Sequence, residues 1–144
     1  MTDLTAPIKH EDTIGDLLMH LGDTHRLMAE HGLEPALAHL IELRASQINQ
    51  CGYCVKMHTR EARQDGETDK RMDRLIVWRH VPDFSAKEKA AFAWVEALTT
   101  LEPGTDYAAL RGDLREHYSD KEISVITTAV AMINLWNRIQ ISKH

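Results

Sequence analysis

The chain is divided by four prolines into intervals whose apolar residues recur with helical rather than alternating spacing. Each proline is expected to end a helix or to occupy the first turn of the next one. Apolar side chains at i, i+3 and i+4 indicate amphipathic helices, and no interval shows the alternation of a half-buried strand. The sequence therefore predicts an all-α domain of about six or seven helices packed compactly. The prolines are Pro7, Pro35, Pro82 and Pro103.

Start and stop signals divide this pattern into helical segments. Ser85 followed by Glu88, and Ser119 followed by Glu122, are capping-box signatures that predict two helix starts. Gly66 predicts a helix end, because glycine accepts the left-handed conformation that follows a last turn. The expected segments are approximately Asp12–Glu30, Pro35–Gln50, Cys51–Gly66, Lys70–Arg79, Ser85–Leu101, Asp106–His117 and Ser119–Ile141.

Length and charge restrict the class of protein. A chain of 144 residues without repeats or a flexible linker predicts one domain, residues 1–144. Its 17 basic and 22 acidic side chains give a net charge of −5, and no basic cluster favours nucleic acid. The apolar stretches are too short to span a membrane, and the first residues lack the features of a signal peptide. We therefore expect a cytoplasmic protein.

The two cysteines lie close to a histidine in the run Cys51-Gly-Tyr-Cys54-Val-Lys-Met-His58. On a helix, residues three and four apart share a face, so Cys51 neighbours Cys54 and Cys54 neighbours His58. Since the cytoplasm keeps thiols reduced, such a pair indicates a working redox couple or a metal site rather than a structural disulfide.

The same atoms permit other interpretations. One interpretation is that the cysteines are buried and inert, and another is that they join His58 and His39 in a Cys2His2 zinc site that stabilises the fold. The remaining histidines, His25 among them, are scattered and expected at the surface. The aromatic residues, including Trp136, are expected in the core or at subunit contacts.

The stretch from Glu42 to Arg63, which reads ELRASQINQCGYCVKMHTREAR, resembles the alkyl hydroperoxidase D-like branch of the carboxymuconolactone decarboxylase family. The resemblance extends from about Leu33 to the carboxyl end and includes Asn134-Leu-Trp136-Asn-Arg138. A Cys-x-x-Cys pair alone is weak evidence, but the histidine four residues later and the approach Ala-Ser-Gln-Ile-Asn make the match specific.

The resemblance implies a compact helical fold, assembly into trimers or hexamers, and thiol-based reduction of hydroperoxides without a cofactor or a bound metal. By this resemblance Cys54 reacts with the peroxide, Cys51 resolves the sulfenic acid to a disulfide, and His58 belongs to a proton relay. An external thiol or dithiol reductant then regenerates the pair. Family members that decarboxylate lactones lack these cysteines, which argues against that reaction.

One position departs from the family pattern. The family has a glutamate twelve residues before the first cysteine, and this chain has His39 there. Glu42 lies one helical turn further on the same face and is a candidate replacement in the relay. Glu61, three residues after His58, is a second candidate to orient the imidazole.

Three functions are therefore compatible with the sequence. The first is a thiol peroxidase, in which His58 makes Cys54 the reactive sulfur, although the helix start would favour Cys51. The second is a disulfide reductase or redox relay that exchanges thiols with another protein. The third is a zinc-stabilised helical module without turnover.

Overall fold

The computed structural model describes residues 1–144, all of whose regular elements are helical. The predicted all-α class is therefore confirmed, and strands are absent. The elements are α1 (His10–Gly22), α2 (Thr24–Glu30), α3 (Pro35–Ile48), α4 (Gly52–Gln64), α5 (Asp69–Arg74), the 3-10 helix η1 (Leu75–His80), α6 (Ala86–Thr100), α7 (Tyr107–Arg115) and α8 (Asp120–Ile141).

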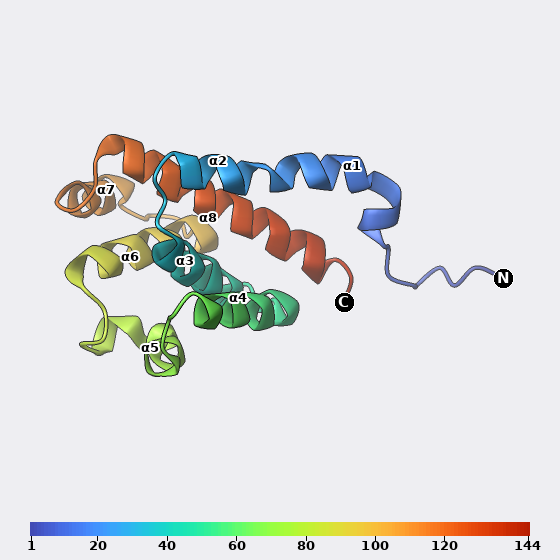
Figure 1. The fold of residues 1–144 in the computed structure, drawn as a ribbon, viewed down its shortest axis with the longest axis horizontal. Helices are drawn as coiled ribbons and strands as arrows, with labels where there is room; N and C mark the ends of the chain where they lie inside the picture. Colours follow the sequence, from blue (N-terminus) through green and yellow to red (C-terminus); the bar gives the residue numbers. More distant parts are fainter.

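Helix α3 is the central element of the fold. It packs against α4, α6 and α8, and Figure 1 shows it surrounded by these helices. Pro35 occupies its first turn, where a missing N–H costs no hydrogen bond. Ile41 belongs to the larger hydrophobic cluster with α6 and α8, whereas Leu40 and Leu43 belong to a second cluster with α4, η1 and α6. Because both clusters share α3, its orientation is determined by packing on both sides.

Two of the seven predicted segments are each divided in the structure. The segment predicted over Asp12–Glu30 forms α1 and α2, which are separated at Asp23, directly after Gly22. Glycine has the greatest backbone freedom, so a break beside it costs little helical stability. The two helices follow one another along one edge of the molecule (Figure 1).

The segment predicted over Lys70–Arg79 ends its α-helix at Arg74 and continues as η1. Val77 leaves helical geometry, with φ −117° and ψ 27°. In a 3-10 helix, residues three apart lie on the same face, which places both Leu75 and Trp78 in the core. The prediction of a continuous α-helix was wrong because this packing depends on neighbouring helices.

The other predicted helix ends agree with the structure to within two residues. Both capping boxes form, at Ser85 with Glu88 and at Ser119 with Glu122. Gly66 adopts a positive φ of 95° after α4. None of the helices is both long and apolar enough to traverse a bilayer.

Candidate functional site

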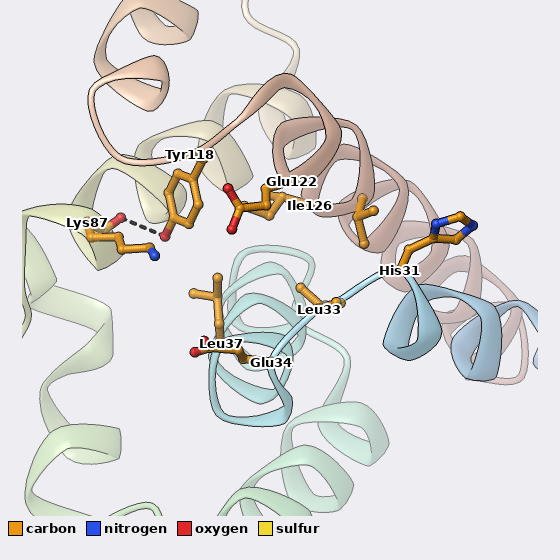
Figure 2. Close-up of a pocket in the computed structure, with 10 residues that line it drawn as sticks. His31, Leu33, Glu34, Leu37, Lys87, Tyr118, Glu122 and Ile126 are labelled. Atoms are coloured by element: carbon orange, nitrogen blue, oxygen red, sulfur yellow. Dashed lines mark hydrogen bonds between the residues drawn. The ribbon is translucent and has the colours of Figure 1, made fainter.

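The cavity at the amino end of α3 does not suit a substrate (Figure 2). Its volume of about 40 Å³ leaves room for only a few water molecules. Tyr118 lines it and donates a hydrogen bond to the Lys87 carbonyl oxygen at 2.9 Å. Burial, with the nearby charges of Glu88, Glu122 and Glu34, raises the pKa of Tyr118, so its phenol stays protonated and unreactive at neutral pH.

The cysteines lie at the turn from α3 to α4. Gln50 takes a left-handed conformation with φ 56°, which is unfavourable for a residue with a side chain and reverses the chain direction after α3. Cys51 then caps α4, since its Sγ accepts a hydrogen bond from the Cys54 N–H at 3.3 Å. The N–H of Cys51 donates to the carbonyl oxygen of Ser46 at 3.1 Å. This turn fixes both sulfurs relative to α3.

Cys51 and Cys54 form a disulfide, with 5.3 Å between their Cα atoms. They are 0% and 1% exposed, respectively. In this oxidised state neither sulfur is available to a Cys2His2 zinc site. Cys54 lines an adjoining cleft, whereas Cys51 does not, so the two sulfurs differ in access.

The cleft beside Cys54 has a volume of about 430 Å³, enough for a small organic molecule. It is formed mainly by α3, α4 and α8. Tyr53, at its edge, is 58% exposed. Its lining residues are His25, His39, Glu42, Tyr53, Cys54, Met57, His58, Glu61, Trp136 and Gln140.

His58 is the buried imidazole of this cleft. Its Nδ1 lies 2.9 Å from Oε2 of Glu42 and 3.5 Å from Oε2 of Glu61. These are ion-pair distances, but neither ring nitrogen has a partner aligned for a hydrogen bond. The carboxylate nearest to the imidazole is thus Glu42, the residue proposed from the sequence as the replacement for the family glutamate.

His39 is directed elsewhere, although it lines the same cleft. Its Nε2 lies 2.6 Å from Oδ2 of Asp65, the residue after α4. The structure therefore brings four of the five predicted site residues to the cleft surface, with the fifth, Cys51, behind Cys54.

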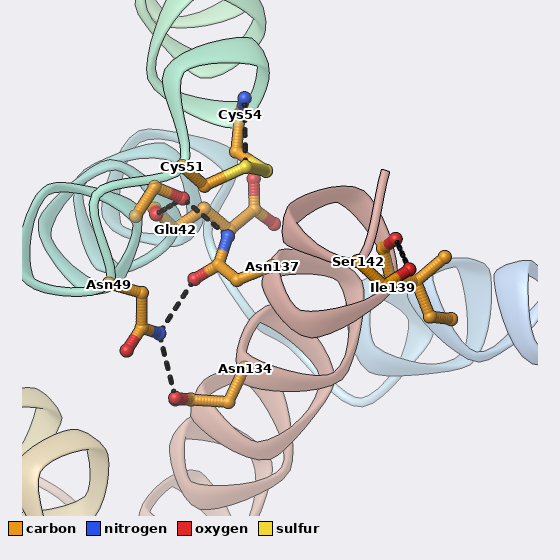
Figure 3. Close-up of a disulfide and its surroundings, with 9 residues drawn as sticks. Glu42, Asn49, Cys51, Cys54, Asn134, Asn137, Ile139 and Ser142 are labelled. Atoms are coloured by element: carbon orange, nitrogen blue, oxygen red, sulfur yellow. Dashed lines mark hydrogen bonds between the residues drawn. A yellow bond between two sulfur atoms is a disulfide. The ribbon is translucent and has the colours of Figure 1, made fainter. Parts of the chain in front are cut away.

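A buried amide network lies beneath the disulfide and joins α3 to α8 (Figure 3). The Asn49 side-chain amide donates to the Oδ1 atoms of Asn134 and Asn137, at 2.9 Å in each case. Asn137, which is fully buried, donates to Ser46 Oγ at 3.0 Å. Satisfied networks of this kind fix a unique packing arrangement. Asn134 and Asn137 are three residues apart in an apolar helix, and this spacing could have predicted that they share one buried face.

His25 was predicted at the surface, which is wrong. It is half-buried in the cleft, and its Nε2 accepts a hydrogen bond from Trp136 Nε1 at 2.8 Å. These residues come from α2 and α8, 111 positions apart. No local pattern relates them, so only the packing of α2 on α8 reveals the contact.

Comparison with known proteins shows the family of the chain. Residues 14–97 match the carboxymuconolactone decarboxylase family. An uncharacterised protein of Bacillus subtilis (strain 168), YdfG, is 32% identical over 120 residues, which cover 83% of this chain and 82% of YdfG.

Solved structures share the fold. One of them is a protein of unknown function from Agrobacterium tumefaciens, proposed to be the antioxidant defence protein AhpD. It is 35% identical to this chain, with a TM-score of 0.88, and the match covers 96% of this chain and 95% of that one. The debrominase Bmp8 has a TM-score of 0.80, with coverage of 99% and 91%, but is 16% identical and supports the fold alone. The chain belongs to the carboxymuconolactone decarboxylase family.

Proposed function

We propose that this protein is a thiol peroxidase that reduces hydroperoxides through Cys54. The observation that carries the proposal is that Cys54 is bonded to Cys51 and also lines the cleft that contains His58 and Glu42. A nucleophile, a resolving thiol and a base with its carboxylate thus occur together. The similarity to a protein proposed for antioxidant defence supports the same chemistry.

The catalytic cycle starts from the dithiol. His58 takes the proton of the Cys54 thiol, because the thiolate is the nucleophile. The thiolate attacks one peroxide oxygen, the O–O bond breaks, and an alcohol leaves with the transferred proton while Cys54 becomes a sulfenic acid. The Cys51 thiol then attacks the Cys54 sulfur, water leaves, and the disulfide forms. Two thiols of an external reductant restore the dithiol and become a disulfide themselves.

The different surroundings of the sulfurs suit different roles. Cys54 faces the cleft, so peroxide and reductant reach it first. When a reductant thiolate attacks Cys54, Cys51 leaves, and the Cys54 N–H already directed at Cys51 Sγ stabilises its negative charge. Good leaving-group thiolates accelerate disulfide exchange. Cys51 is therefore the resolving and leaving sulfur.

The cleft lining favours organic hydroperoxides over hydrogen peroxide. Tyr53, Met57 and Trp136 present apolar surface beside Cys54. Removal of an alkyl or aryl group from water onto this surface adds binding energy that hydrogen peroxide lacks. We place the reaction in the cytoplasm, where thiol reductants are abundant.

Burial of the cysteines disfavours the alternative role as a redox relay between proteins. Exchange with a protein partner requires its sulfur to reach Cys54, which is 1% exposed. Small oxidants and reductants enter a cleft of this size more readily than a folded protein does.

Turnover of cumene hydroperoxide with dithiothreitol tests the proposal. Cys54→Ser should abolish turnover and sulfenic-acid labelling by dimedone. Cys51→Ser should retain labelling at Cys54 but lose disulfide formation, which makes it the matched variant. Full turnover by Cys54→Ser would refute the proposal. Trapping of one protein through a mixed disulfide, without peroxide consumption, would favour the relay, and stoichiometric zinc bound by the reduced thiols would favour the structural module.

A further inference from the structure

His39, Glu42 and Glu61 form a cluster at the surface of the cleft. One ring nitrogen of His39 and one carboxylate oxygen of each glutamate lie within 4.8 Å of one another. Neither glutamate has an ion pair with lysine or arginine, and the only ionisable partner of both is the His58 imidazole. Two carboxylates held this close repel each other unless a cation or a proton lies between them.

The surroundings of the two imidazoles independently indicate a ligand. His58 has a side chain only 8% exposed, yet neither ring nitrogen has a hydrogen-bond partner, and its Nδ1 faces both carboxylates. In His39, Asp65 is bonded to Nε2, and the buried Nδ1 has no partner. A carboxylate that binds one nitrogen of a histidine and leaves the other free is the usual support of a metal-ligating imidazole.

We propose that His39, Glu42 and Glu61, beside His58, bind a divalent transition-metal ion of the Zn²⁺ type. One imidazole and two carboxylates, with the remaining positions open to water, suit Zn²⁺, Co²⁺ or Fe²⁺, whereas Mg²⁺ and Ca²⁺ prefer oxygen ligands alone. At metal–ligand distances of about 2.1 Å, the ligands of a tetrahedral ion stand roughly 3.4 Å apart. The three ligand atoms lie within 4.8 Å of one another, so they must approach one another to reach this value. Glu61, whose side chain is 39% exposed, is free to move the remaining distance.

The ion would act as an inhibitor of the proposed peroxidase, and this consequence rests on the proposed function. A cation held by Glu42 and Glu61, whose carboxylates lie 2.9 and 3.5 Å from His58 Nδ1, disfavours a second positive charge on this imidazole, so His58 accepts the proton of Cys54 less readily. The site differs from the Cys2His2 arrangement because it contains no sulfur. It is therefore available in both the dithiol and the disulfide states.

Titration of the disulfide form with Zn²⁺ and Co²⁺ tests the site without sulfur ligands. Calorimetry should show one equivalent of Zn²⁺, and Co²⁺ should produce visible d–d bands without a thiolate charge-transfer band. His39→Gln and Glu61→Gln should each weaken Zn²⁺ binding at least tenfold. Loss of a residue that only hydrogen-bonds to a metal ligand typically weakens binding about tenfold or more, and loss of the ligand itself should weaken it at least as much. The controls His80→Gln and Glu116→Gln, at exposed positions outside the cleft, should bind like wild type.

Equal binding by wild type and the His39→Gln/Glu61→Gln double variant would overturn the proposal. Circular dichroism identifies a misfolded variant. In the unaltered protein, Co²⁺ should selectively broaden the NMR signals of the His39 and His58 rings. Broadening of other histidine signals only would also overturn the proposal. Because binding is measured without peroxide, zinc binding without peroxidase activity refutes only the proposed function. Peroxidase activity without zinc binding refutes only the metal site.

Discussion

At the residue scale, Glu42 is the carboxylate nearest to His58 and the proposed replacement for the family glutamate. We propose that Glu42 acts through His58 and is therefore a positioning residue. Its carboxylate lies 2.9 Å from Nδ1, whereas Glu61 lies at 3.5 Å and is more exposed. A nearby carboxylate fixes the orientation of an imidazole and stabilises its protonated form.

Glu42→Gln is expected to slow alkylation of Cys54 by iodoacetamide about tenfold near neutral pH, the size of effect typical of a lost neighbouring charge. The neutral amide no longer stabilises the imidazolium that forms when His58 takes the proton of Cys54. The measurement is the pH profile of alkylation, followed by mass spectrometry in reduced protein with a chelator present. Glu42→Asp should restore part of the rate, and Glu61→Gln should have a smaller effect than Glu42→Gln. Unchanged reactivity of Glu42→Gln would contradict the role.

The sequence predicted that Cys51, Cys54 and His58 lie together, but it left Glu42 and Glu61 as alternative partners of the imidazole. Glu42 precedes the cysteines on α3 and Glu61 follows His58 on α4, so both were able to reach the imidazole. In the structure Glu42 lies 2.9 Å and Glu61 3.5 Å from His58 Nδ1, while His39, although close to both glutamates, is paired with Asp65. The packing of α3 against α4 determines which carboxylate lies nearer to His58, and no local spacing in the sequence predicts that packing.

At the element scale, Glu96 joins α6 to α3 and η1. It accepts hydrogen bonds from the Trp78 indole at 2.8 Å and from Arg44 at 2.9 and 3.0 Å, and it also pairs with Arg79. Burial alone would raise the pKa of Glu96, but these hydrogen bonds outweigh it, and the pKa lies below its ordinary value of 4.5. Folding therefore favours the ionised form.

The stability from Glu96 should be complete above pH 4.5 and decrease as the pH falls toward the lowered folded-state pKa. Glu96→Gln removes this charge and is expected to cost about 2 kcal/mol of unfolding free energy at pH 7. Urea unfolding between about pH 3 and pH 7 should show the two proteins converging in acid. Glu102→Gln, at an exposed position, is the control and should follow wild type. A pH-independent difference would contradict the assignment.

The helices themselves were largely predictable, because capping boxes, proline and glycine act locally. The breaks within the two divided segments were not predictable from the sequence. Trp78 reaches the core only through the 3-10 geometry of η1, and its indole finds Glu96 on another helix. Element boundaries of this kind depend on tertiary contacts that override local propensity.

At the scale of the whole molecule, α1 is the element that the fold leaves least covered. It contains no buried residue, although Leu17 and Met19 are apolar and are 50% and 79% exposed. Figure 1 shows α1 at the edge of the molecule, with the amino terminus extending beyond it. An amphipathic helix whose apolar residues remain in water is a candidate subunit contact.

We propose that α1 packs against a second copy of the chain and that the protein forms a trimer or hexamer. Light scattering after size exclusion should give three or six times the 16.4 kDa mass of one chain. Leu17→Lys should shift the mass toward one chain, because a charge in an apolar contact has no partner to offset its desolvation. Ile76→Lys, at a 62% exposed position on η1, is the matched control and should leave the assembly intact. Dissociation by Ile76→Lys alone would place the contact on η1 rather than α1, and a monomeric wild-type protein at all concentrations would refute the assembly.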